Sequence, residues 1–195
     1  MRRTQQERSD ATKAALITAG RGLFATRGYD AVAAEEIAAA AGVTRGALYH
    51  HFDGKRGLFE AVFLEIEREL IAQFPLEELL GADPFDALLS GVARFLELSL
   101  DIEVQRITLL DGPAVLGWAR WHEIESEFGL GLIQAGLTAA IEAGQLRELP
   151  VPELATALLG ALVEAALLVS RATDPERTKA AAIEAVEALL QGLRA

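Results

Sequence analysis

The chain has 195 residues, of which 51% are hydrophobic and 24% are charged, and it contains no cysteine. This composition excludes a largely disordered chain and a fibrous repeat. The lack of cysteine excludes disulfide scaffolds, thiolate zinc sites and cysteine nucleophiles. The polar N-terminal residues lack the apolar stretch of a secretory signal, so we expect a cytoplasmic protein.

The net charge of −11 is distributed unevenly along the chain. Residues 1–56 carry a net charge of +3, whereas residues 57–195 carry −14. A polyanion such as DNA is attracted by the first segment and repelled by the second. We therefore predict two domains, a nucleic-acid-binding domain at 1–56 and an acidic body at 57–195 that faces away from DNA.

Apolar residues recur at helical spacing along most of the chain, and no alternating pattern predicts a strand. In the first domain, Gly28 is expected to end the first helix and Gly42 to separate the second from the third. Three short helices with a tight glycine turn between the last two follow the plan of a helix-turn-helix. The predicted helices run from Ser9 to Gly28, over 34–41, over 45–52 and from Lys55 onward.

Two acidic residues followed by proline mark helix starts in the body, at Asp83-Pro84 and Asp174-Pro175. Asp111-Gly112-Pro113 is expected to end a helix. The apolar stretch from Leu154 to Ser170 is short and contains Glu164, which favours a packed helix over a membrane span. The predicted helices cover 84–100, 102–110, a segment from Val115 or Trp118 to 144, 152–171 and 175–193, so the fold is all-α with about nine helices.

The third predicted helix carries the candidate DNA contacts. In a helix-turn-helix this helix lies in the major groove. Leu48 and Phe52 face the core, which leaves Arg45, Gly46, Tyr49 and His50 facing outward. We predict that Arg45 reads a guanine edge, that Tyr49 and His50 contact phosphate or base, and that Gly46 lets the backbone approach. Thr44 and Lys55 are predicted to donate to phosphate.

Several motifs resemble the tetracycline-repressor (TetR) family, namely Gly28-Tyr29-Asp30, Ile37-Ala38, the run from Ala41 to Phe52, and Lys55. Residues 111–118 and 159–171 resemble one branch of that family. The resemblance implies a homodimeric repressor that binds a palindromic operator in double-stranded DNA and responds to a small-molecule effector. It also implies that the last two long helices form the dimer interface.

The last two predicted helices carry apolar stripes that would be exposed to solvent in a monomer. Stripes at three- and four-residue spacing suit antiparallel packing in a four-helix bundle. The predicted interface residues are Leu159, Leu162, Val163, Ile183, Val186, Leu190 and Leu193.

An apolar pocket between helices of the body would receive a lipophilic effector. The same side chains equally suit a core that holds no ligand. Glu164 interrupts an apolar stripe and needs a partner, so it either forms a structural pair or polarises one end of the pocket. The predicted effector contacts are Phe95, Arg106, Leu110, Trp118, Trp121, His122, Glu125, Phe128 and Glu164.

One position departs from the family pattern. Ala33 stands where the family usually has Thr or Ser, so half of the capping box with Glu36 is missing, at a cost of ~1 kcal/mol. Gly20 and Gly22 add ~1 kcal/mol each if they are helical. We therefore predict a DNA-binding domain of low intrinsic stability, whose helices are ordered mainly by contacts with the body and with DNA.

Two other functions are compatible with parts of the sequence. An enzyme with a helical active site could use His122 with Glu125 or Glu164 as acid and base. The sequence has no recognisable nucleophile, however, and the second histidine of a zinc-hydrolase motif is replaced by Ser126. We therefore expect no catalytic residues, no metal and no cofactor. The other alternative is a constitutive DNA-binding regulator without a ligand.

Overall fold

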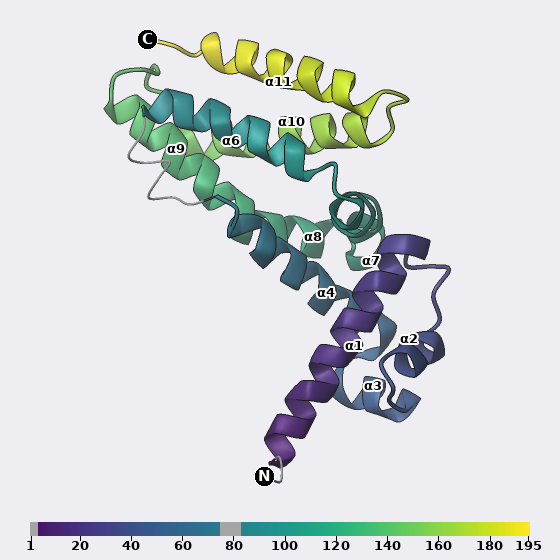
Figure 1. Ribbon diagram of the computed structural model, residues 1–195. Helices are drawn as coiled ribbons and strands as arrows, with labels where there is room; N and C mark the ends of the chain where they lie inside the picture. The colour runs from purple at the N-terminus through teal and green to yellow at the C-terminus, as the bar shows by residue number, and fades with distance from the viewer. Residues whose placement is uncertain (1–3, 75–82) are drawn as a thin grey trace.

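The computed structural model describes residues 4–74 and 83–195. Within these ranges the regular secondary structure is helical (Figure 1). One isolated antiparallel β-bridge in the described residues pairs Leu146 with Arg194. When helical segments that continue without a break are counted as one, the described residues form nine helices, which confirms the predicted all-α fold. The segments are α1 (Gln5–Arg27), α2 (Ala34–Ala40), α3 (Arg45–His51), α4 (Gly54–Ile71), α6 (Pro84–Leu98), η1 (Val104–Asp111), α7 (Gly112–Leu116), α8 (Trp118–Glu125), η2 (Ser126–Leu130), α9 (Gly131–Glu142), α10 (Val151–Ser170) and α11 (Pro175–Gln191), where η1 and η2 are π-helical.

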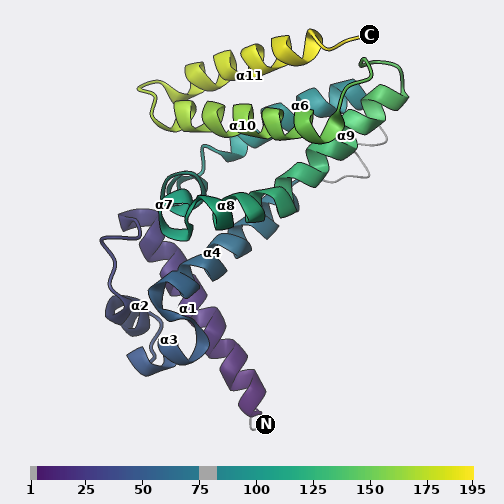
Figure 2. The same ribbon diagram turned by 180° about the vertical axis from the view of Figure 1, so that it is seen from behind.

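The molecule is elongated, with the N-terminus at one end and the C-terminus at the other (Figure 1). Helices α1, α2 and α3 form one end, and α6, α9, α10 and α11 form the other (Figures 1 and 2). Helix α4 starts beside α3 and runs into the body, so a single helix joins the two parts. The predicted boundary after Arg56 falls in the first turn of α4.

A capping box begins α1. The hydroxyl of Thr4 accepts from the backbone N–H of Glu7 at 3.2 Å, and the Glu7 carboxylate accepts from the N–H of Thr4 at 2.7 Å. The predicted start at Ser9 was therefore too late, because this box was not recognised. The predicted ends of α2 and α3 agree with the structure to within one residue.

The predicted helix end at Asp111-Gly112-Pro113 is wrong. The π-helical η1 continues directly into α7, and the break comes at Gly117, whose φ of +79° lies in the left-handed region that favours glycine. A proline removes one regular helical hydrogen bond, and the altered bonding of π-helical turns accommodates it. The chain therefore passes through Pro113 without leaving the helix.

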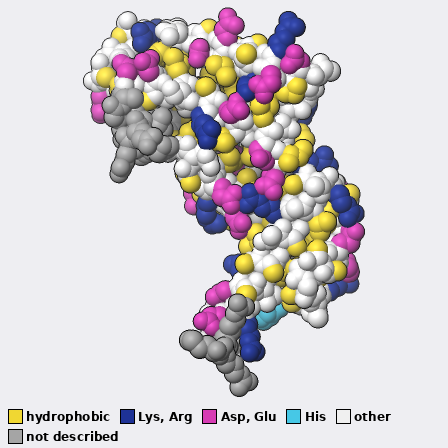
Figure 3. Space-filling model, in the orientation of Figure 1, with side chains coloured by type: hydrophobic (Ala, Val, Ile, Leu, Met, Phe, Trp, Pro, Cys, Tyr) yellow, Lys and Arg dark blue, Asp and Glu magenta, His cyan; other side chains and the backbone are white. Residues whose placement is uncertain are grey.

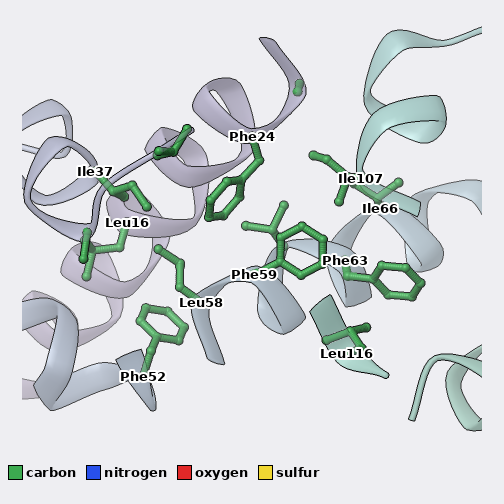
Figure 4. Close-up of a cluster of buried hydrophobic side chains, with 14 of the residues drawn as sticks. Leu16, Phe24, Ile37, Phe52, Leu58, Phe59, Phe63, Ile66, Ile107 and Leu116 are labelled. Atoms are coloured by element: carbon green, nitrogen blue, oxygen red, sulfur yellow. The ribbon is translucent and has the colours of Figure 1, made fainter. Parts of the chain in front are cut away.

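One hydrophobic core joins the DNA-binding end to the body (Figure 4). Phe24 of α1 and Phe59 of α4 pack edge to face, with ring centroids 5.3 Å apart, and Ile107 of η1 and Leu116 of α7 complete the cluster. Gly20 permits this packing, since a Cβ there would lie 3.3 Å from Leu58 Cδ2. A second core lies among α6, α9, α10 and α11.

Helix α10 is the one helix among the described residues that is long and apolar enough to cross a membrane, by length and composition alone. It packs against α6, α9 and α11, and 33% of its most apolar window is buried within the chain. It is a core helix of the body.

Candidate DNA-binding face and effector cavity

Helices α2 and α3 form the predicted helix-turn-helix. Gly42 makes the turn with a φ of +69°, and the N–H of Val43 donates to the carbonyl of Ala38 at 2.9 Å. Ile37 of α2 and Leu48 of α3 are fully buried between these helices and α1. The burial of one face of α3 leaves its opposite face outward.

The outward face of α3 presents four of the predicted contacts. The side chain of Arg45 is 61% exposed, Tyr49 is 50% exposed, and Gly46 and His50 are also exposed. The Arg45 guanidinium forms an ion pair with Glu35 of α2 at 2.7 Å and lies 5.2 Å from the centroid of the Tyr49 ring. A nucleic acid that uses Arg45 must therefore compete with Glu35, and an exposed ion pair of this kind is weak because water screens it.

Thr44 caps α3, because its hydroxyl oxygen accepts from the N–H of Ala47 at 3.3 Å. Its own hydroxyl proton remains able to donate to phosphate. At α2 the predicted half of a capping box is present: Glu36 accepts from the N–H of Ala33 at 2.9 Å, and Ala33 offers no side-chain acceptor. A hydrogen bond from Arg27 is the main cause that lowers the pKa of Glu36.

The structure gives Lys55 a role that differs from the predicted phosphate contact. Its Nζ donates to the carbonyl oxygens of Tyr29 and Val32, each at 2.9 Å. It also lies 3.9 Å from the centroid of the Tyr29 ring, which is cation–π distance. Lys55 is half-buried and holds the loop between α1 and α2 onto α4. Sequence spacing placed it at a helix start but could not show that two carbonyl groups lie in reach.

Charge on the surface follows the division that the sequence predicts. In the view of Figure 3, the end of the molecule that carries α3 shows Lys and Arg side chains and a histidine, with some Asp and Glu side chains near them. Asp and Glu side chains are frequent over the middle and upper parts. The basic end is thus the part that suits a polyanion.

A polar junction connects η1 with the loop after α1. The Asp111 carboxylate accepts from the backbone N–H of Tyr29 at 2.7 Å. The Arg106 guanidinium covers Gly28, and its Nε lies 3.6 Å from Asp111. On the other side of η1, the indole N–H of Trp121 donates to the carbonyl of Thr108 at 3.2 Å. Helix α8 is therefore linked through η1 to the DNA-binding end.

The body contains a cavity of about 130 Å³ between α4, α6, α8, η2, α9 and α10. The lining contributed by the described residues is apolar apart from two carboxyl groups. The lining residues are Glu67, Leu70, Ile71, Phe74, Pro84, Ala87, Leu88, Gly91, Val92, Phe95, Glu125, Gly129, Leu132, Ile133, Gly136, Ala139, Leu158, Leu159 and Leu162.

Two predicted effector contacts, Phe95 and Glu125, line this cavity. The other seven do not. Trp118 is 68% exposed and stacks on His122, while Trp121 is buried and bonded to Thr108. Arg106 covers Gly28, Leu110 lies on the surface, Phe128 packs against the first core, and Glu164 is exposed.

Glu67 is the functional candidate that sequence reasoning missed. It lies on α4 between Phe63 and Leu70, and it is only 6% exposed; Glu125 is 9% exposed. Burial raises the pKa of Glu125 to about 7. Burial, followed by the negative charge of Glu125, raises the pKa of Glu67 well above its usual range. The signal was available, since Glu67 shares helical spacing with the apolar stripe of α4.

Comparison with known proteins agrees with this architecture. Residues 85–193, more than half of the chain, match the family described as "Tetracyclin repressor-like, C-terminal domain". Residues 16–62 match "Bacterial regulatory proteins, tetR family". The chain belongs to the TetR family. It is therefore a member of a family of helix-turn-helix transcriptional regulators, which is not an enzyme family.

Individual TetR-family proteins resemble the chain over different lengths. The TetC protein of transposon Tn10 from Escherichia coli is 29% identical over 143 residues, which cover 73% of this chain and 72% of TetC. The transcriptional repressor BepR of Brucella suis is 35% identical over 114 residues, which cover 55% of this chain and 51% of BepR. The crystal structure of a TetR-family regulator from Pectobacterium atrosepticum is 33% identical, covers 98% of each chain and has a TM-score of 0.84.

Four of the seven residues predicted to form the dimer interface face inward within the single chain. Leu159, Leu162, Val186 and Leu190 are buried within the single chain, and Val163, Ile183 and Leu193 are half-buried. The helical spacing correctly indicated packed stripes, but within the chain α10 and α11 pack against α6, α10 also packs against α9, and the two helices pack against each other.

The outward face of α10 and α11 is different from the predicted one. It carries Leu168 and Leu189, 61% and 63% exposed, together with small residues. Glu164 shares this face with Gly160 and Leu168, at a spacing of four residues, so it is not the buried charge that the sequence suggested. The exposed positions on this face include Ala157, Gly160, Glu164, Leu168, Ala181, Glu184, Ala185, Ala188 and Leu189.

Proposed function

We propose that the protein is a homodimeric repressor that binds a palindromic operator through α3 and releases it when a small molecule fills the body cavity. The observation that carries this proposal is the outward face of α3, where Arg45, Tyr49 and His50 stand exposed on a helix capped by Thr44. The family membership supports it, and DNA as the target implies a cytoplasmic location.

The contacts divide by chemistry. The guanidinium of Arg45 can bond a guanine through two N–H groups, which is the commonest specific contact in the major groove. Tyr49, His50 and the hydroxyl of Thr44 are suited to phosphate or base edges. Gly46 has only the Thr44 side chain near its Cβ position, at 3.8 Å, so the α3 backbone can come close to DNA.

A second copy of the chain is proposed to cover the outward face of α10 and α11. Small residues there allow close helix packing, and Leu168 and Leu189 supply apolar area that water now contacts. Two such helices from each chain make a four-helix bundle. For the dimer to bind, its two α3 helices must lie about one turn of DNA apart, ~34–36 Å.

Release requires that the effector bind one shape of the dimer better than the other. The cavity wall includes α4 and α8, and α8 is joined through Trp121, η1 and Asp111 to the backbone of Tyr29. We propose that filling the cavity shifts this junction and with it the separation of the two α3 helices.

The test is selection of bound fragments from genomic DNA by the purified protein at about physiological salt, which suppresses weak nonspecific binding. Enrichment of a palindrome by the wild-type protein, and its loss with Arg45→Ala, is the expected result. Glu127→Gln, a change on the exposed side of the body, is the control and should select the same fragments. A folded, ligand-free dimer that enriches nothing would contradict the proposal.

A further inference from the structure

Two buried carboxyl groups are the polar part of an otherwise apolar cavity. Glu67 of α4 and Glu125 of α8 are 6% and 9% exposed, and both line the cavity. Within the described residues neither carboxylate takes part in a hydrogen bond or an ion pair.

This arrangement is unfavourable when the cavity is empty. A buried charge without a partner is costly, and a second carboxylate nearby adds repulsion. The pair avoids this cost by retaining protons, which is why burial raises the pKa of both groups. No basic residue stands among the described lining residues to neutralise them. A bound cation would supply the missing partner.

We propose that the effector is a compact lipophilic cation whose positive group lies between Glu67 and Glu125. This inference rests on the proposed function, because it assigns the ligand class of the same cavity. An anionic ligand would bring a negative charge into a cavity whose described lining supplies no basic partner for it. A purely apolar ligand would fill the cavity and leave both carboxyl groups without a partner.

The remaining lining sets the size and character of the ligand. The cavity volume of about 130 Å³ is close to the ~150 Å³ of an apolar cavity that holds benzene. The rings of Phe74 and Phe95 line the same space, and aromatic rings attract cations. A quaternary or protonated amine with one small apolar group meets these requirements.

The acidic pair lies at the end of the cavity nearer the DNA-binding domain. Along the continuous helix from α8 to α9 the lining begins at Glu125 and ends at Ala139, and the α8 end lies towards α7 and α1 (Figure 1). Glu125 follows Trp121 by one helical turn, and Trp121 is bonded to η1. A cation that draws Glu67 and Glu125 together therefore acts on α4 and α8, the helices that connect the body to α3 and to η1.

The experiment compares three probes of nearly equal shape, using the full-length protein and calorimetry. Phenyltrimethylammonium is a permanent cation, tert-butylbenzene is its neutral isostere, and 4-tert-butylphenol is a neutral hydrogen-bond donor. At pH 8 the cation should bind at least about tenfold more tightly than either neutral probe. Equal or tighter binding of a neutral probe would overturn the proposal.

The pH dependence gives a test that needs no substitution. At pH 6 Glu125 retains its proton, which cation binding must expel to solvent, whereas at pH 8 that proton has already left. Affinity should therefore fall about tenfold between pH 8 and pH 6. Among the described residues that line the cavity, from α4, α6, α8, η2, α9 and α10, there is no other titratable group. At pH 6 this proton release should appear as a buffer-dependent binding enthalpy, and its absence at that pH would overturn the proposal.

Substitutions then assign the effect to residues. Glu67→Gln and Glu125→Gln preserve shape and remove the charge, and each should abolish most of the cation preference over tert-butylbenzene. Glu127→Gln removes the same charge from an exposed position near Glu125 and should change nothing. Retention of the preference by both cavity variants would refute the proposal.

The fragment selection described above separates this inference from the proposed function. If the protein enriches an operator but the cavity prefers neutral probes, the cation inference fails alone. If the cavity prefers the cation but no DNA is enriched, the regulator proposal fails and the ligand class stands.

Discussion

A substitution at Lys55 tests whether its amine stabilises the fold or contacts DNA. We consider the substitution Lys55→Met, which keeps an unbranched side chain and removes the ammonium group. The ammonium donates to the carbonyl groups of Tyr29 and Val32 at 2.9 Å and lies over the Tyr29 ring. All three interactions hold the loop between α1 and α2 in place.

The magnitude follows from these contacts. A hydrogen bond to a charged group contributes ~1.5–3 kcal/mol, and the lower value applies because Lys55 is half-buried. The cation–π contact adds ~0.5–1 kcal/mol. The apolar methionine side chain offsets a small part of this loss in stability when it is buried. We therefore expect Lys55→Met to lower the free energy of unfolding by about 3 kcal/mol.

Urea unfolding at a fixed protein concentration measures this loss. With a denaturant slope of ~2 kcal/mol per molar, the midpoint should fall by about 1.5 M at unchanged slope. Lys13→Met, a change at an exposed position of α1, is the control and should stay within ~0.5 kcal/mol of wild type.

Measurement of operator binding by the Lys55→Met protein tests the alternative, that Lys55 contacts phosphate. A phosphate contact would leave stability unchanged and reduce the salt dependence of DNA binding by about one unit of slope. If Lys55→Met behaves in that way, the structural reasoning is refuted and the role expected from the sequence is restored.

Four further changes test other parts of the structure. Arg45→Ala should relax base preference and cost ~1–3 kcal/mol of operator binding; equal loss on all operator variants would mean that it contacts only phosphate. Ala33→Ser should raise the free energy of unfolding by about 1 kcal/mol, because Ala33 already has the extended backbone of an N-cap, and unchanged hydrogen exchange in α2 would contradict this. Leu189→Asp should give a folded monomer by light scattering, whereas Leu190→Asp, at a buried position, should unfold the body; a dimeric Leu189→Asp protein would rule out the proposed face. Finally, folded Glu125 binds a proton that the unfolded chain releases between pH 4.5 and about 7, so unfolding free energy should fall by up to about 3 kcal/mol as pH rises through that window, and Glu125→Gln should remove this slope.

Local patterns in the sequence predicted most of the fold. The spacing of apolar residues located the helices, and Gly42 and Thr44 marked the turn and the cap of α3, because backbone geometry at these positions depends on near neighbours. The missing cap at Ala33 was equally local and was found correctly. The errors at Ser9 and Pro113 were also local, since a capping box and a π-helical turn were overlooked.

Site residues in the body were harder to predict because their roles depend on distant partners. Helical spacing shows that Glu67, Glu125 and Glu164 each interrupt an apolar stripe, but it cannot show what lies opposite each stripe. The structure places the first two in a cavity and the third on the surface. It likewise turns Leu190 inward and Leu189 outward within the single chain, which helical spacing alone does not show.

The sequence by itself determined the helical class, the helix-turn-helix and the exposed face of α3, because each depends on residues within a few positions of one another. Only the tertiary structure decided which amines and carboxylates have partners. Lys55 meets carbonyl groups that come from residues 29 and 32, and Glu67 meets Glu125 across more than fifty positions of chain. The energy of a polar group is set by what surrounds it in space, and that surrounding is assembled only when distant helices pack.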